Sequence, residues 1–258
     1  MKPRVVAVVN QKGGVGKTTT AINLGATLAA YERRTLLVDL DPQGNCTTGL
    51  GFEPTAGCAT SYDVVTGSAE LDAAVRPTDF PHLCVVPATP DLAGAEVELV
   101  GMVGREFRLR EAIHGVAGHH FVLIDCPPSL GLLTINALVA ADTLLIPIQC
   151  EYYAMEGVSK LMNTMNEVRR FLNPELAIDG VVLTMYDDRT NLAQQVAEEV
   201  RSVFGDLVFR TVVPRNVRLA EAPSFGRPIH AYDLRSKGAQ AYLELGREYL
   251  ARTEVVFG

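Results

Sequence analysis

The chain has 258 residues, 48% of them hydrophobic and 21% charged, with a formal net charge of -7 at pH 7. This composition is that of a globular protein with a large core, and no apolar run approaches the roughly 20 residues of a transmembrane helix. The five cysteines form no CxxC pair, which argues against zinc, iron–sulfur and disulfide frameworks, and the acidic balance argues against wholesale coating by nucleic acid.

Short apolar runs alternate with amphipathic stretches along most of the chain. Near-continuous apolar strands are typical of a parallel sheet that helices cover on both faces. The predicted fold class is therefore α/β, with one doubly wound domain over residues 1–258 and a mainly parallel sheet. Because the first strand begins about four residues into the chain, no N-terminal helix-turn-helix domain is expected. Strands are predicted over residues 5–9, 35–38, 83–86, 121–124, 143–148, 181–184 and 208–213, and helices over 18–30, 156–171, 192–204 and 237–250.

The first strand runs into Gly-Gly-Val-Gly-Lys-Thr at residues 13–18 and then a helical pattern, which is the context of a P-loop. The glycines let backbone N–H groups point at phosphate oxygens, and the helix N-terminus adds the positive end of its dipole. Lys17 is predicted to reach the terminal phosphates and the Thr18 hydroxyl to bind Mg²⁺. Thr19 is predicted to contact the α-phosphate or cap the helix. The predicted nucleotide-binding set is Lys12, Gly13, Gly14, Val15, Gly16, Lys17, Thr18 and Thr19.

This loop departs from the general pattern GxxxxGK[ST], because Gln11 stands where a glycine is usual and Lys12 adds a second lysine. Taken alone, Lys12 is compatible with a solvated surface cation. Its position at the mouth of the phosphate loop favours a contact with phosphate instead.

Two further strands end in carboxylates. Residues 121–124 run into Asp125, the predicted Mg²⁺ ligand, but Cys126 follows where many P-loop ATPases carry a water-orienting glutamate. At the end of the second strand, alternation places Asp39 and Asp41 on one face, where ligands of open α/β sheets bind. One of these acids is predicted to order water and metal and the other to position the nucleophile. A capped loop with solvated carboxylates is the alternative.

Six motifs in order resemble the deviant Walker A ATPases of the ParA/Soj type, over nearly the whole chain: KGGVGKTT, LLVDLDPQGN, LIDCPP, PIQCEYYAMEG, LTMYDDRTNL and VVPRNVRLAEAPSFG. The resemblance implies P-loop NTPase architecture and a slow, partner-stimulated, Mg²⁺-dependent ATPase that forms an ATP-sandwich homodimer. It implies that Lys12 reaches phosphates bound by the partner subunit, that Asp41 is needed for hydrolysis, and that Asp39 supports the metal beside Asp125. The implied adenine contacts are Met185, Pro214 and Asn216.

Basic residues gather late in the chain, with six between residues 208 and 238 against two acidic ones. From charge alone they suit either phosphate contacts or ordinary surface ion pairs. The resemblance implies non-specific DNA binding by the ATP dimer, a cytoplasmic, nucleoid-associated location and a ParB/Spo0J-like partner that stimulates hydrolysis. Arg189 and Arg218 match the family's DNA-binding motifs, and Arg215 and Arg247 are further candidates.

Two other functions remain open at this point. A membrane-positioning ATPase resembling MinD would end in a basic amphipathic helix, whereas residues 251–258 carry one acid, one base and no sustained amphipathic period. A redox or metal-trafficking relative would need paired cysteines. No membrane partner is therefore expected, and the cargo is a chromosome, a plasmid or a protein assembly.

Overall fold

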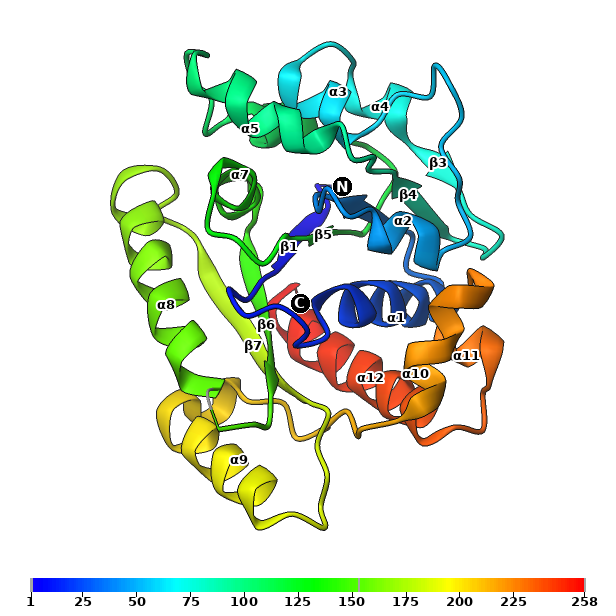
Figure 1. The fold of residues 1–258 in the computed structure, drawn as a ribbon, viewed down its shortest axis with the longest axis vertical. Helices are drawn as coiled ribbons and strands as arrows, with labels where there is room; N and C mark the ends of the chain where they lie inside the picture. Colours follow the sequence, from blue (N-terminus) through cyan, green and yellow to red (C-terminus); the bar gives the residue numbers. More distant parts are fainter. Residues whose placement is uncertain (1, 153, 258) are drawn as a thin grey trace.

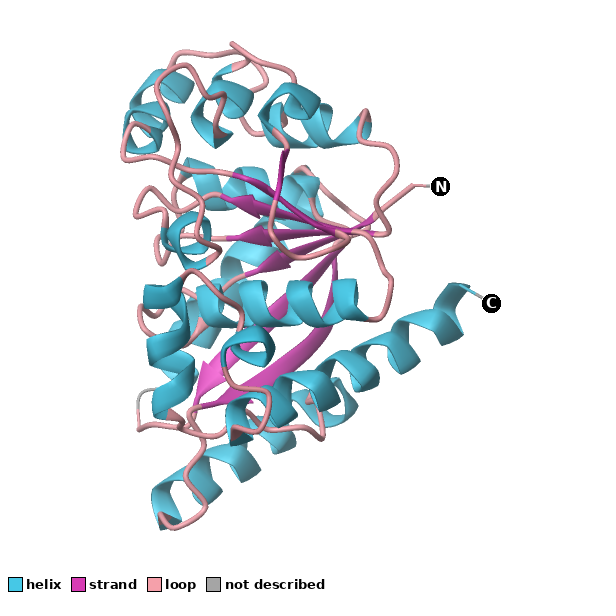
Figure 2. Cartoon of the chain, turned by 90° about the vertical axis from the view of Figure 1, so that its right-hand side faces the viewer, coloured by secondary structure: helices cyan, strands magenta, loops and turns pink. Residues whose placement is uncertain are grey.

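The computed structural model describes residues 2–152 and 154–257, built around a seven-stranded sheet in the order β3-β4-β2-β5-β1-β6-β7. Neighbouring strands are parallel except the β3–β4 pair. Figure 2 shows the main strands ending at one edge of the sheet. The predicted α/β class with a mainly parallel sheet is confirmed. The strands are β1 (Arg4–Val8), β2 (Thr35–Asp39), β3 (Arg76–Pro77), β4 (Leu83–Val86), β5 (Phe121–Asp125), β6 (Thr143–Gln149) and β7 (Ala177–Thr184).

Helices cover both faces of this sheet. Alternation along β1 sends Val5 and Ala7 into one core, with α5 to α9, and Val6 and Val8 into the other, with α1 and α12. Figure 1 shows α7 and α8 on one side of the strands and α1 and α12 on the other. The helices are α1 (Lys17–Ala30), α2 (Asn45–Gly49), α3 (Ser61–Thr66), α4 (Leu71–Ala74), α5 (Leu92–Val100), α6 (Arg108–His114), α7 (Leu132–Ala140), α8 (Ala154–Phe171), α9 (Asn191–Phe204), α10 (Val217–Glu221), α11 (Ile229–Tyr232) and α12 (Lys237–Phe257), with 3-10 turns η1 (Gly205–Leu207) and η2 (Ala222–Phe225).

The strand predicted over residues 208–213 is wrong. This segment runs beside β7 but forms only isolated bridges, including one between Val181 and Val208. The reason lies in α12, where the Glu248 carboxylate accepts hydrogen bonds from the backbone N–H groups of Arg210 and Thr211. Because the Glu248 side chain accepts these two backbone N–H groups, they are not available for hydrogen bonds to a neighbouring strand.

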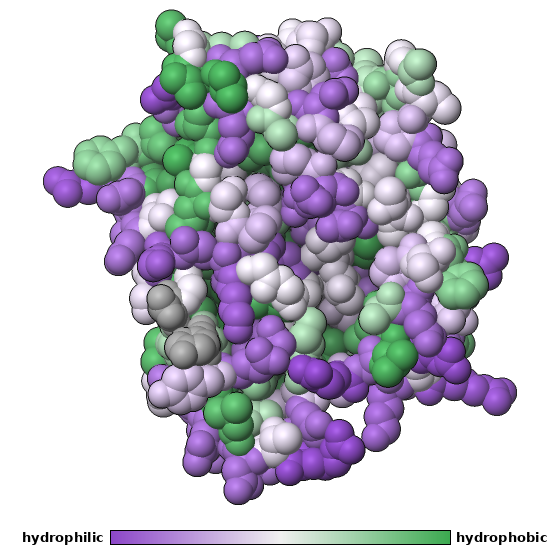
Figure 3. All heavy atoms as spheres, viewed as in Figure 1, coloured by the Kyte–Doolittle hydropathy of each residue, from purple (hydrophilic) through white to green (hydrophobic). Residues whose placement is uncertain are grey.

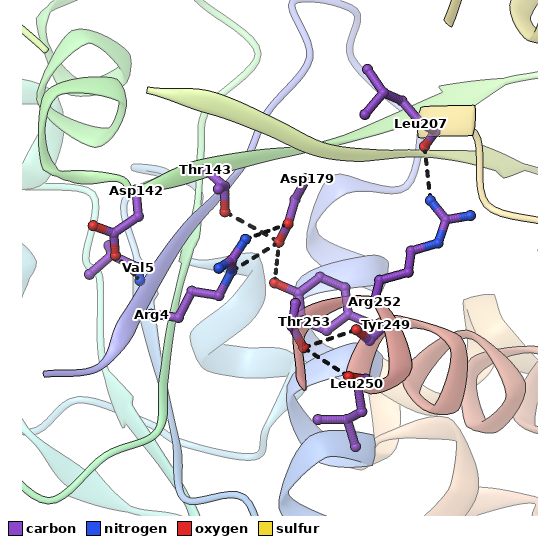
Figure 4. Close-up of polar contacts among 10 residues, drawn as sticks. All are labelled: Arg4, Val5, Asp142, Thr143, Asp179, Leu207, Tyr249, Leu250, Arg252 and Thr253. Carbon is purple, nitrogen blue, oxygen red and sulfur yellow. Dashed lines mark hydrogen bonds and ion pairs between the residues drawn. The ribbon is translucent and has the colours of Figure 1, made fainter. Parts of the chain in front are cut away.

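The last helix is fixed to the sheet by a buried polar cluster. Figure 4 shows Arg4, Thr143 and Tyr249 converging on the carboxylate of Asp179. Arg4 and Asp179 form an ion pair at 2.6 Å, with side chains only 13% and 10% exposed. The cluster therefore joins β1, β6, β7 and α12 at the edge of the sheet where β1 begins.

Candidate functional site

The phosphate loop joins β1 to α1 at the edge where the parallel strands end. Gly14 and Gly16 have φ angles of 74° and 85°, in the left-handed region that glycine adopts without strain. An added Cβ at Gly13 or Gly14 would meet no other atom within 4 Å, so the concave side of the loop is open. The carbonyl of Val15 accepts a hydrogen bond from the Thr184 hydroxyl at 2.8 Å, which ties the loop to the end of β7. This arrangement suits phosphate groups.

The two lysines of the loop have different surroundings. Lys17 is 7% exposed, and its Nζ donates to the carbonyl oxygen of Lys12 at 3.1 Å. Burial lowers the pKa of Lys17, while Asp125 and neighbouring acidic groups act against that shift. The Lys12 side chain is 31% exposed at the rim, with its Nζ 3.7 Å from Glu151. Lys17 therefore faces the inside of the loop and Lys12 its outer edge.

Asp125 is the carboxylate available to a metal. It is fully buried, and neither of its oxygens has a hydrogen-bond partner among the described residues. Burial, and then the charge of Asp39, raises the pKa of Asp125 well above its usual range, while the Thr18 hydroxyl and Lys17 act in the opposite direction. A buried carboxylate with two free oxygens beside a hydroxyl and a phosphate loop fits Mg²⁺ bound with a nucleotide.

Asp39 is the register partner of Asp125 on the adjacent strand, but both of its carboxylate oxygens accept hydrogen bonds within the protein. One accepts from the backbone N–H and hydroxyl of Thr47, at 2.8 and 2.6 Å, and the other from the N–H of Asp41 at 3.2 Å. Burial raises the pKa of Asp39 to about 6. Asp41 is 7% exposed and accepts a hydrogen bond from the N–H of Gln43. Asp39 thus holds the turn that carries Asp41, and its predicted support of the metal is indirect in this geometry.

The three predicted adenine contacts, Met185, Pro214 and Asn216, come together in a pocket of about 350 Å³ beside the phosphate loop. Its walls are largely apolar, as a purine ring requires. Sequence reasoning missed Tyr242 of α12, which lines the pocket and whose hydroxyl lies 3.1 Å from that of the buried Thr20. The lining residues are Gly16, Thr19, Thr184, Met185, Val213, Pro214, Arg215, Asn216, Val217, Leu219, Ala220 and Tyr242.

Each arginine predicted to contact DNA is paired with an acid. The pairs are Arg189–Asp187 at 2.7 Å, Arg215–Glu151 at 3.3 Å, Arg218–Glu221 at 2.8 Å and Arg247–Glu244 at 2.7 Å. All four arginines are more than half exposed, and exposed pairs of this kind are weak enough for phosphate to replace the acid. Figure 3 views the protein from the edge of the sheet where the parallel strands end. Hydrophilic residues gather over α9 at the bottom of this view.

Glu151 is a second residue that sequence reasoning missed. It lies near both Lys12 and Arg215, and its position is fixed by the amide of Gln149, which donates to it at 2.6 Å. The PIQCEYYAMEG motif contains Glu151, but nothing local predicts its neighbours. Within residues 2–152 and 154–257, no group of three or more His, Cys, Asp and Glu side chains is placed to hold a metal, and no helix is long and apolar enough to cross a membrane.

Residues 3–178 match a family described as AAA domain. The chain is 57% identical over 250 residues to "Chromosome partitioning protein ParA" of Myxococcus xanthus, an alignment that covers 96% of this chain and 88% of that protein. It is 55% identical over 249 residues to "Sporulation initiation inhibitor protein Soj" of Bacillus subtilis, covering 96% and 98%.

Solved structures are similar over nearly the full length. "Cobyrinic Acid a,c-diamide synthase" of Mycobacterium smegmatis, with a bound ATP analog and magnesium, matches with a TM-score of 0.85 at 39% identity, covering 98% of this chain and 96% of that one. The cell division ATPase MinD of Pyrococcus furiosus matches with a TM-score of 0.77 at 30% identity, covering 96% and 98%.

Proposed function

The chain belongs to the ParA/Soj family of chromosome-partitioning P-loop ATPases and hydrolyses ATP with Mg²⁺, and we propose that it dimerises around ATP and binds DNA without sequence preference. In this way it segregates a chromosome or plasmid together with a ParB-like protein. That partner stimulates a slow intrinsic hydrolysis, which separates the dimer and releases it from the nucleoid.

The position of Lys12 is the observation that carries this proposal. Lys17 already occupies the inside of the phosphate loop, whereas the ammonium of Lys12 lies at the exposed rim. A cation there suits phosphates held by a second copy of the chain. Such a group acts like an arginine finger, which accelerates hydrolysis by roughly 10³ to 10⁵ in other NTPases.

The other residues take roles that their surroundings support. Lys17 binds the terminal phosphates, Thr18 and Asp125 hold Mg²⁺, and Asp41 orients the attacking water. Met185 and the segment before α10 hold the adenine. Bound Mg²⁺ supplies charge that stabilises the transferring phosphoryl group.

DNA binding is proposed for the exposed arginines. Because the chain carries a net charge of -7, contact with DNA depends on a local face and not on overall attraction. Two copies of that face in one dimer bind more tightly than either alone, which couples DNA binding to ATP.

The test is DNA retention by the Asp41→Ala protein, which traps ATP. We expect it to sediment as a dimer and to bind random-sequence duplex DNA with ATP but not with ADP. Glu175→Ala, which removes an exposed acid, is the matched control and should behave as wild type. A trapped dimer that shows no DNA retention would overturn the DNA-binding proposal.

A membrane-positioning role is the second candidate, because MinD shares this fold at 30% identity. Co-sedimentation of the same Asp41→Ala protein with anionic lipid vesicles separates the two. We expect the protein to stay in the supernatant with ATP. Vesicle binding that requires ATP, without DNA binding, would favour the membrane role.

A further inference from the structure

A groove of about 600 Å³ lies between the loop after β7, the segment before α10 and the first turn of α12. Its walls bring together three cations from distant parts of the sequence, Arg189, Arg215 and Lys237. Arg189 matches a DNA-binding motif of the family and Arg215 is a further candidate for DNA contact, whereas no role was predicted for Lys237. The groove places this lysine beside them.

Packing at the start of α12 fixes the position of Lys237. The Ser236 hydroxyl accepts the N–H of Ala239 at 3.1 Å and caps the helix. A Cβ added to Gly238 would lie 2.7 Å from Leu219, so this turn packs tightly against α10. Ala241, one helical turn further along, lines the same groove. The fold therefore fixes where the backbone of Lys237 lies, at the wall of the groove.

Lys237 differs from the two arginines in its electrostatic surroundings. Arg189 is paired with Asp187 and Arg215 with Glu151, whereas Lys237 forms no ion pair within the described residues. The first turn of α12 contains no acid. A lysine at a helix N-terminus opposes the helix dipole and is unfavourable there unless an anion is close by. An anion in the groove would interact favourably with both the lysine and the dipole.

The net charge of the groove also depends on Lys237. Asp187 and Asp188 line it together with the three cations, so the two acids offset the two arginines. Lys237 supplies the remaining positive charge. Asp187 is held by Arg189 through bonds of 2.7 and 2.8 Å, which lower its pKa to about 2 and keep it ionised at neutral pH.

We propose that Lys237 contacts a phosphate of the DNA backbone, and that one strand of the duplex passes along this groove beside Arg189 and Arg215. The inference rests on the proposed function, because it says where the DNA binds. A lysine suits the contact as a point charge that needs no fixed geometry. A contact with a backbone phosphate does not read the bases, which is consistent with DNA binding that has no sequence preference.

The experiment compares Lys237→Ala with wild type bound to a nonhydrolysable ATP analogue. Binding to a random-sequence duplex is followed by fluorescence anisotropy over a series of salt concentrations. For each substituted chain of the dimer, we expect the affinity at 0.1 M salt to fall by about tenfold and the salt slope to decrease by about one. Lys237→Arg, which keeps the positive charge, should restore both the DNA affinity and the salt slope. Lys160→Ala is the matched control, because Lys160 is an exposed lysine on α8 outside the groove.

Sedimentation and ATP affinity are measured on the same variants and should not change. Unchanged DNA affinity and salt slope in Lys237→Ala, with wild type binding normally, would overturn the inference. So would a loss of ATP-dependent dimers, because the lysine would then act on assembly. If wild type with the analogue fails to bind DNA, the proposed function itself is wrong.

Discussion

Asp39 and Asp125 are neighbours in register at the ends of β2 and β5, and both are completely buried. Burial is the main reason that the pKa of each carboxyl is raised in the folded protein. In the unfolded chain both ionise near pH 4. The folded state therefore binds protons more tightly, and its free energy of unfolding falls as pH rises above the unfolded pKa.

Replacing Asp125 by asparagine should separate stability from activity. Asp125→Asn removes one of the two buried charges, so we expect a higher free energy of unfolding in the absence of metal and nucleotide. Between pH 5 and pH 8 the gain should grow by about 1.4 kcal/mol for each pH unit until the pH passes the folded pKa of Asp125. Mg²⁺-dependent ATP hydrolysis should be lost.

Urea denaturation in EDTA at the two pH values measures this effect. Asp72→Asn, which removes an exposed acid, is the control and should change little. A gain for Asp125→Asn that is the same at pH 5 and pH 8 would mean that the raised pKa does not affect folding.

At the scale of elements, two tyrosine hydroxyls of α12 make contacts from which we expect different consequences. Near its start, the Tyr242 hydroxyl contacts that of Thr20 of α1, and Tyr242 lines the pocket proposed for adenine. Further along, the Tyr249 hydroxyl donates to the Asp179 carboxylate at the other edge of the sheet. We expect the first contact to affect nucleotide binding and the second to affect stability.

Two matched substitutions test this division. Tyr249→Phe keeps the ring against Phe121 and Phe209 and removes only the hydroxyl. We expect it to lower the free energy of unfolding by about 1.5–3 kcal/mol, the range for a hydrogen bond to a charged group, with ATP affinity unchanged. Tyr242→Phe should weaken ATP binding with a smaller loss of stability. Calorimetric titration and urea denaturation measure both, and equal effects of the two variants on ATP affinity would contradict the assignment.

Strands were predictable where the burial of a parallel sheet leaves a continuous apolar run, as in β4 and β5. Helices were predictable where one face is polar, as in α8 and α9. Helix α7 was not predicted because nearly all its residues are apolar and show no amphipathic period. Helices α10 and α11 were not predicted because each is a single turn, too short for a period to show. Residues 208–213 have the composition of a strand, but a carboxylate of α12 takes two of their N–H groups.

The site divides in the same way. Lys17, Thr18, Asp41 and Asp125 could be proposed from the sequence because they stand in short motifs at strand ends. Tyr242 could not, because its place in the base pocket depends on how α12 packs against α1. Local sequence carries no information on that contact.

At the scale of the whole molecule, the position of Lys12 at the rim of the phosphate loop leads to a prediction about assembly. Lys17 bonds to the backbone carbonyl of Lys12, so Lys12→Ala leaves that bond intact. We expect the variant to bind ATP, to stay monomeric with ATP, and to lose hydrolysis by roughly 10³-fold. Sedimentation and steady-state ATPase assays measure this, with Lys160→Ala as control. Normal hydrolysis by the variant would make Lys12 an ordinary surface charge.

The attachment of α12 also has a consequence for protein synthesis. The phosphate loop leaves the ribosome early, but the base pocket needs Tyr242, and β1 needs partners as distant as Phe121, which pairs with Arg4. A nascent chain therefore carries the phosphate loop long before it has a complete nucleotide pocket. We therefore expect ATP binding to be completed only after α12 has been synthesised and has packed against α1.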